Sequence, residues 1–221
     1  MHFETHSNDC YGSLTITAHP ELQKRIIDSL QGTGEEEGNP FDFNKVIPMP
    51  DYIFRGNIGP QEKEQYGKNN WYDWSIENWG TKWNSYDTER DGNSFSFYTA
   101  WAPCHPVIRA LAKKYPDARF EYWYEEPGWG FCGHEIYEHG QAQYLMEADL
   151  EENYNDDEDD DPLFEDYEEW REDITITVFD IINGVKRGRI ERRENRDDCI
   201  RIIKGVFVER INSSTDAAAC A

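Results

Sequence analysis

The chain has 221 residues, enough for one domain with an appendage, and its 14% of aromatic residues excludes a wholly disordered protein. Its 45 Asp and Glu against 22 Lys and Arg give a net charge of −23, which favours basic partners over nucleic acid or anionic membrane. No apolar run approaches the about 20 residues that cross a bilayer, and the first residues, MHFETHSNDCYG, lack a signal-peptide pattern, so we expect a cytoplasmic protein.

The first third of the chain predicts two strands around one helix. Residues 12–18 alternate apolar and polar side chains, as a strand does. In residues 20–30 four aliphatic side chains share one helical face, with proline at the first helical position and a glycine shortly after the end. Residues 41–48, FDFNKVIP, predict a second strand. The prolines and glycines that follow predict an irregular insert over residues 48–80.

The middle of the chain predicts a strand, a helix and three more strands. Residues 93–101 alternate, with phenylalanines on one face, and a helix with an apolar stripe follows from Pro106. Residues 118–126, 131–139 and 141–147 then alternate as strands. This order predicts an α+β fold, a ferredoxin-like antiparallel sheet with two helices on one face, extended at its C-terminal side by a β-hairpin.

A strongly acidic tract follows these strands. Residues 147–173 contain sixteen Asp or Glu and one Arg, a net charge of −15, centred on the run NDDEDDDP. Like charges at this density repel one another and keep the backbone extended. Leu163, Tyr167 and Trp170 have helical spacing, so a short amphipathic helix is the alternative to a plain linker.

The chain after the tract is basic and predicts a hairpin. Residues 174–182 alternate, and Asn183-Gly184 is a strong two-residue turn pattern before a return strand. Asn195 predicts the start of a short helix that runs to Ile203, and residues 206–211 predict a last strand. The expected parts are a ferredoxin-like domain at 1–147, an acidic linker or short helix at 148–173, and a basic hairpin extension with a frayed tail at 174–221.

Four of the eight tryptophans fall in the stretch NNWYDWSIENWGTKWN. If a strand begins after the glycine of this stretch, Trp83 lies within that strand and Trp79 lies just before it. We therefore expect Trp79 and Trp83 to reach the core. Trp71 and Trp74, which lie on the irregular approach, are the candidates for surface contact.

Three stretches carry a family resemblance: WGTKWN at 79–84, TAWAP at 99–103 and the aromatic strand at 120–124. With them the chain resembles the YubB-like proteins of phages and conjugative plasmids over about residues 10–147. It departs from their pattern at Cys104, where a second proline is more typical. The resemblance implies a ferredoxin-like domain and a mobile-element origin. It implies no established activity and no catalytic residues.

Cysteine and histidine residues offer one possible metal site. Cys104, His105, Cys132 and His134 supply four ligands of the kind that zinc prefers, but no CxxC or HxxxH step aims two of them at one ion. The acidic run fails the EF-hand pattern because no register places glycine at the sixth position. We assign no metal, no cofactor and no catalytic residue, and we keep a metal-binding or hydrolytic enzyme that uses these Cys and His residues as the alternative.

A nucleic-acid-binding ferredoxin-like module is a second alternative. Five aromatic side chains of the predicted strands could stack on bases: Phe95, Phe97, Phe120, Tyr122 and Tyr124. The acidic balance argues against this function, since phosphate contacts need Lys or Arg. We expect these rings to face the helices as core. Glu125 and Glu126 are no acid/base pair, because neighbours on a strand point to opposite faces.

The acidic tract is the feature that favours a function. Carboxylates interrupted by aromatic rings can imitate a nucleic-acid backbone and occupy the basic groove of a host protein that handles nucleic acid. We therefore expect a non-enzymatic, DNA-mimicking inhibitor of host defence. A solvated linker, or internal neutralisation of the basic hairpin, is the alternative role of the tract. The expected partner-binding residues are Glu151, Glu152, Asp156, Asp157, Glu158, Asp159, Asp160, Asp161, Glu165, Asp166 and Trp170.

Overall fold

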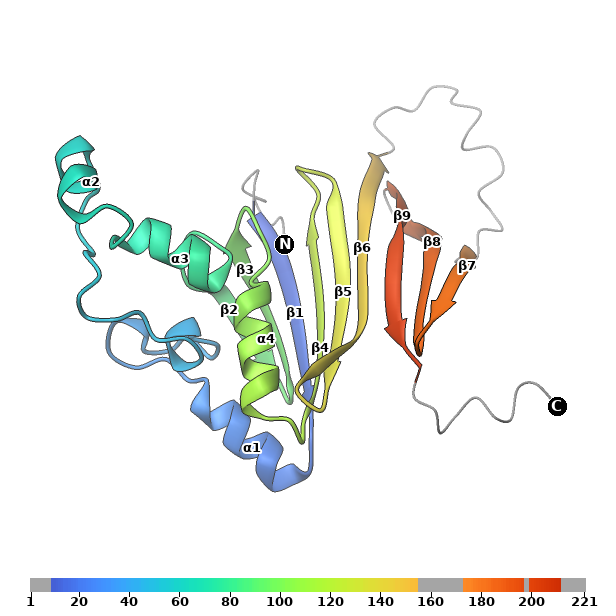
Figure 1. Cartoon of the computed structure of the whole chain (residues 1–221), viewed down its shortest axis with the longest axis horizontal. Coiled ribbons are helices and arrows are strands. Elements are labelled where there is room, and N and C mark those ends of the chain that lie inside the picture. The colour runs from blue at the N-terminus through green and yellow to red at the C-terminus, as the bar shows by residue number, and fades with distance from the viewer. Residues whose placement is uncertain (1–8, 155–172, 197–198, 212–221) are drawn as a thin grey trace.

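A computed structural model describes residues 9–154, 173–196 and 199–211, which form one antiparallel sheet with helices at one end (Figure 1). The nine described strands lie in the order β2-β3-β1-β4-β5-β6-β9-β8-β7. Their bounds are β1 Asp9–Thr17, β2 Tyr86–Asp91, β3 Ser94–Ala100, β4 Arg119–Glu126, β5 Phe131–Glu138, β6 Gln141–Tyr154, β7 Asp173–Ile182, β8 Val185–Arg196 and β9 Cys199–Arg210. The helices are α1 Pro20–Ser29, α2 Pro60–Tyr66, α3 Trp71–Trp79 and α4 His105–Lys114, with short 3-10 turns at Gly34–Glu36 and Phe43–Lys45.

Six elements have ferredoxin-like connectivity. Without the insert that contains α2 and α3, the chain runs β1-α1-β2-β3-α4-β4, and the strands lie in the order β4-β1-β3-β2 with every pair antiparallel. Both helices begin with proline in the first turn, where a missing N–H costs nothing, and α4 ends on two lysines that suit its dipole. The ferredoxin-like prediction is confirmed, but the sheet is larger than expected.

The predicted second strand at residues 41–48 is wrong. Its two phenylalanines are fully buried, but they reach the core from a 3-10 turn in which the Asp42 side chain accepts a hydrogen bond from the Asn44 N–H. The alternation of apolar and polar residues at Phe41, Asp42 and Phe43 therefore arises from a capped turn, in which both rings enter the core on either side of the aspartate. The second strand of the fold is β2, which follows the long insert.

The insert is partly helical. Trp79 lies in the core as predicted, whereas Trp74 and Trp83 have exchanged the positions expected for them. Trp74 and Trp79 lie on α3 and pack edge to face in the core, with ring centroids 5.2 Å apart. Gly80 ends the helix in the left-handed conformation, at φ 82°, so the chain turns before Trp83. Trp83 lies outside any strand with 44% of its surface exposed, and the Lys82 ammonium sits 4.0 Å from its ring centroid.

One face of the sheet packs on the helices. Alternate residues of β3 and β4 point to this face, and all five aromatic residues proposed as a stacking platform are buried there: Phe95, Phe97, Phe120, Tyr122 and Tyr124. Because these rings lie under the helices, they cannot stack on bases. The expectation that these rings form the core is therefore confirmed, and the alternative of a stacking platform is wrong.

The C-terminal segments extend the sheet. β6 continues to Tyr154, past the expected boundary at residue 147, and pairs along its length with β9. The predicted helix from Asn195 to Ile203 is wrong, because the chain from Cys199 onward is strand β9. Gly205 is no helix stop: an added Cβ would lie 2.1 Å from the Glu147 carbonyl oxygen, so glycine lets β9 approach β6 closely.

The predicted hairpin at residues 174–182 and beyond is confirmed. β7 and β8 are joined by Asn183 and Gly184, both at positive φ as this two-residue turn requires. β7 forms the outer edge of the sheet, and in Figure 1 the strands β9, β8 and β7 extend away from the helices. Among the described residues, no helix has the length and apolar character to cross a membrane.

Candidate functional site: an acidic hollow beside helix α4

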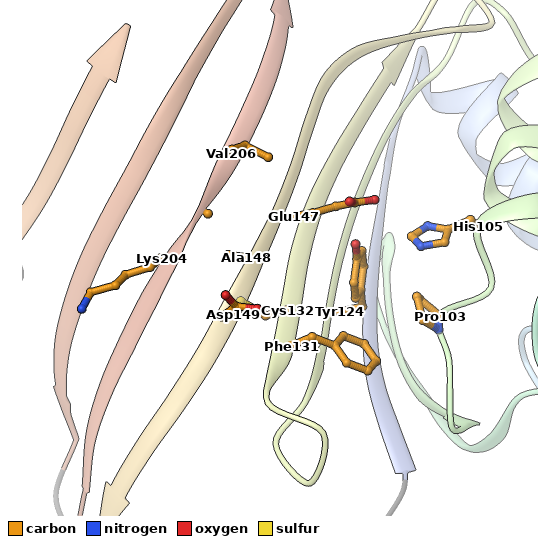
Figure 2. Close-up of a pocket in the computed structure, with 11 residues that line it drawn as sticks. Pro103, His105, Tyr124, Phe131, Cys132, Glu147, Ala148, Asp149, Lys204 and Val206 are labelled. Carbon is orange, nitrogen blue, oxygen red and sulfur yellow. The ribbon is translucent and has the colours of Figure 1, made fainter. Parts of the chain in front are cut away.

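A hollow of about 550 Å³ opens between the start of α4 and the strands β5, β6 and β9. It lies on the helix-covered face of the sheet, at the point where α4 stops covering that face. Figure 2 shows the side chains that line it, with Glu147 pointing towards Tyr124 and His105. The lining residues are Pro103, His105, Tyr124, Phe131, Cys132, Glu147, Ala148, Asp149, Lys204, Gly205 and Val206.

His105 forms one wall of the hollow and is held by a buried carboxylate. Its Nδ1 lies 2.8 Å from Oε1 of Glu135, an ion-pair distance without the alignment of a hydrogen bond. Its ring stands edge-on to that of Tyr124, with centroids 5.0 Å apart. The sequence gives His105 this position because it opens α4 directly above β5.

Glu135 is the centre of a small polar network under the hollow. The Tyr137 hydroxyl donates to its Oε2 at 2.9 Å, and Nε of Arg109 donates to that hydroxyl at 3.2 Å. Burial raises the pKa of Tyr137, with the nearby Glu135 carboxylate adding to the effect. The tyrosine therefore keeps its proton and remains a donor to Glu135.

Aromatic rings form the floor of the hollow. Tyr124 is buried and Phe131 half-buried, and their ring centroids lie 6.4 Å apart. Burial, followed by the Glu135 and Glu147 carboxylates, raises the pKa of Tyr124. Neutral rings beside carboxylates suit a cation, because a guanidinium or ammonium group can lie over the ring and pair with the acid.

The strand β6 carries a row of carboxylates along the hollow and beyond it. Glu147, Asp149 and Glu151 are all exposed, and as every second residue of one strand they lie on the same face at intervals of about 6.6 Å. None of the three forms an ion pair with another described residue. We call these three residues the acidic row. It is the described beginning of the −15 tract.

The structure separates the two described members of the predicted partner-binding set. Glu151 belongs to the acidic row, but Glu152 points to the opposite face, where its Oε1 lies 2.8 Å from Nε of Arg201. Arg201 is 7% exposed and also contacts Glu125 and, at 3.8 Å, Glu194. Glu152 is therefore paired within the sheet, and its role in partner binding stays a prediction, as does that of Glu151.

The other predicted partner-binding residues lie outside the described residues. They are Asp156, Asp157, Glu158, Asp159, Asp160, Asp161, Glu165, Asp166 and Trp170. The possible helix at residues 163–170 lies outside them as well.

The four proposed zinc ligands are divided by the sheet. Cys104 and His105 lie on the helix-covered face, with the Cys104 sulfur 3.7 Å from the Tyr122 hydroxyl. Cys132 packs on the opposite face, and His134 stacks there on Trp123 with centroids 3.8 Å apart. Within the described residues, no group of three or more His, Cys, Asp or Glu side chains is placed to hold a metal ion.

The buried thiols and the paired glutamates do not form a catalytic centre. Burial raises the pKa of Cys132 to about 11 and that of Cys104 further still, so neither is a thiolate nucleophile at neutral pH. Glu125 points to the Arg201 face, whereas Glu126 is buried and accepts from the backbone N–H of Trp129. This separation of the two glutamates was predicted from strand alternation.

The sequence reasoning missed most of the hollow. The sequence suggests His105 only as a metal ligand or as a residue of a hydrolytic enzyme, and it does not single out Glu135, Glu147 and Asp149 as a group. The sequence does contain a pattern for the acidic row, because acids recur at every second position in EADLE, residues 147–151. The contact between His105 and Glu135 joins a helix start to a strand 30 residues later, and no local pattern predicts it.

A comparison with protein families supports the ferredoxin-like fold. Residues 78–169 match the family model described as the ferredoxin-like domain in Api92-like protein. A crystal structure of a protein api92 from Yersinia pseudotuberculosis is 21% identical, with a TM-score of 0.30 over 33% of this chain and 28% of that chain. No curated protein matches this chain. The matching model is that of Api92-like proteins, so the comparisons do not support the narrower resemblance to YubB-like proteins.

Proposed function

We propose that this is a non-enzymatic protein that binds a basic, nucleic-acid-handling host protein. The acidic row and the hollow beside it form the binding surface. The observation that supports this most is the acidic row itself: three exposed carboxylates on one face of β6, none in an ion pair with another described residue, with Lys204 of β9 as the cross-strand neighbour of Asp149. Evenly spaced negative charge is also what a nucleic-acid backbone presents to its binding proteins. A basic groove that accepts phosphates fits such a surface.

The hollow provides a place for an arginine side chain of the partner. A guanidinium there would lie against Tyr124 and Phe131 and pair with the Glu147 carboxylate, which points into the hollow. Arginine fits better than lysine because its planar group stacks on rings and pairs with two oxygens at once. The one lysine of the lining, Lys204, extends away from His105 and Tyr124 (Figure 2).

The wider proposal is that the acidic surface imitates DNA and thereby inhibits a host defence protein. The gene would belong to a phage or plasmid that benefits from this inhibition. The mobile-element origin rests on the YubB-like resemblance of the sequence. The tract beyond Tyr154 contains further acids in the sequence, and the proposal assigns them to the same partner. The proposal therefore predicts a partner that also binds DNA and that duplex DNA displaces.

Capture from a bacterial host lysate tests this function. The wild-type chain is compared with two variants, one with Asp156–Asp161 replaced by Ser and Asn, and one with Glu147→Gln, Asp149→Asn and Glu151→Gln. We expect a basic, DNA-binding protein that wild type retains at low salt, that both variants lose, and that duplex DNA releases. A partner held equally by all three chains at low salt contradicts the role of the acidic surface.

A further inference from the structure

The two edges of the sheet differ in how they are protected from pairing with another strand. β2 is short, irregular in register and charged, with Asp87, Glu89, Arg90 and Asp91 exposed. These are the devices by which proteins prevent edge-to-edge association. β7 has ten residues without Lys, Arg or Pro; its sequence has two aspartates, and its one register shift against β8, between Val178 and Asp180, lies beyond the regularly paired segment 174–178. It exposes six large apolar side chains by 42–62% of their surface: Ile174, Ile176, Val178, Phe179, Ile181 and Ile182. A long apolar edge of this kind invites another strand.

We propose that β7 pairs with β7 of a second copy of this chain, antiparallel about a two-fold axis that passes between the two Ile176 residues. Ile176 already pairs with Ile190 of β8. The two-fold register therefore forms a cross-strand row of four isoleucines, Ile190 and Ile176 from each copy. It also places Ile174 opposite Val178 of the second copy, so the exposed aliphatic row of each chain covers the other. A shift by one residue would oppose isoleucine with threonine.

The other face of β7 brings an arginine and a glutamate into one row in the same register, and this glutamate, Glu191, also pairs with Arg193 of its own chain, with Oε1 and Nη2 3.0 Å apart. Within one chain Thr177 pairs with Arg189, and Thr175 pairs with Glu191. Across the two-fold axis, Thr177 meets Thr175 of the second copy. Arg189 of one chain and Glu191 of the other then lie at the ends of a row with only two short threonines between them, and symmetry repeats this pairing. Arg189 is exposed and forms no ion pair within the described ranges.

The oligomeric state of the full chain, measured by light scattering over a concentration series, tests this pairing. We expect a dimer, twice the chain mass of 26.0 kDa. Ile176→Lys places two like charges opposite each other, and we expect it to weaken the dimer by at least about 100-fold, tenfold or more for each lysine. The matched control is Ile76→Lys on α3, another half-exposed isoleucine, which should leave the dimer intact.

Two variants, each with one introduced cysteine, test the register of the pairing. Both are made in a chain in which Cys199 and Cys220 are replaced by serine. Ile176→Cys should form a disulfide between copies under mild oxidation, whereas Thr177→Cys, which faces Thr175 of the second copy, should not.

Three results overturn the proposal. They are a wild-type monomer at every concentration, a dimer that Ile176→Lys leaves unchanged, and equal crosslinking of the two cysteine variants. Ile176→Lys leaves the acidic row intact, so a failure here does not affect the proposed function.

Discussion

The two ends of the sheet are built from different interactions. At the ferredoxin-like end, helices α1 and α4 cover one face and bury fully enclosed rings such as Phe97 and Tyr122. At the other end, β7, β8 and β9 extend from β6 with a small apolar cluster at the junction and a polar network around Arg201. Covered apolar area dominates folding energy. The first end therefore supplies most of the stability, and the second end supplies surface.

The largest expected difference between the two ends is in the effect of shortening an apolar side chain. Phe97→Ala removes a fully buried ring at the covered end and should lower the free energy of unfolding by about 3–5 kcal/mol. Ile181→Ala on β7 removes a side chain that is 62% exposed and should cost less than about 1 kcal/mol. Urea denaturation of both variants measures the contrast. Equal losses would mean that β7 is buried against something in solution.

The next largest effect tests how the extension is attached. Arg201 of β9 is buried and contacts Glu125 of β4, Glu152 of β6 and Glu194 of β8. Arg201→Ala leaves these carboxylates without their shared cation, so we expect a loss of about 3 kcal/mol in unfolding free energy, with the strands β7 to β9 affected first. Hydrogen exchange resolved by segment measures this. Arg90→Ala, an exposed arginine on β2, is the control and should stay within about 0.5 kcal/mol.

A smaller expected effect is a pH dependence of the stability that arises from His134, which lies on the face of the sheet opposite the helices. Burial lowers the pKa of His134, and the nearby Glu121 carboxylate offsets this only in part. The unfolded chain therefore takes up this proton at a higher pH than the folded chain, so stability falls as pH drops below about 6.5. We expect His134→Gln to flatten the pH dependence of the urea midpoint between pH 7 and pH 5.5. The exposed His139→Asn should leave the wild-type slope, and an unchanged slope in both variants would contradict the assignment to His134.

The sequence predicted those parts of the fold that depend on local periodicity. The helices at Pro20 and Pro106, the aromatic strand β4 and the turn at Asn183-Gly184 follow from proline, alternation and turn chemistry. The incorrect predictions concern segments whose secondary structure is decided by tertiary contacts. Phe41 and Phe43 alternate as in a strand but reach the core from a turn, and Asn195 has the chemistry of a helix cap although the pairing of β9 with β6 and β8 prevails.

The site was predicted less well than the fold. Charge counting found the acidic tract, and Glu151 is the one described member of the predicted set that faces outward beside the hollow. Counting could not tell Glu151 from Glu152, because their roles depend on which face of β6 each occupies and on Arg201, about 50 residues away in the sequence. The hollow itself depends on where α4 ends its cover of the sheet, which no local pattern encodes.

The most direct measurement of the central claim is the equilibrium affinity, at low salt, for the basic partner captured by wild type. It compares the acidic-row variant, Glu147→Gln with Asp149→Asn and Glu151→Gln, with a matched variant that neutralises three exposed acids elsewhere, Glu35→Gln with Glu37→Gln and Glu64→Gln. Both variants change the net charge equally. We predict that the acidic-row variant binds at least about tenfold more weakly while the matched variant stays within about twofold of wild type. Equal affinities of the two variants would contradict the account.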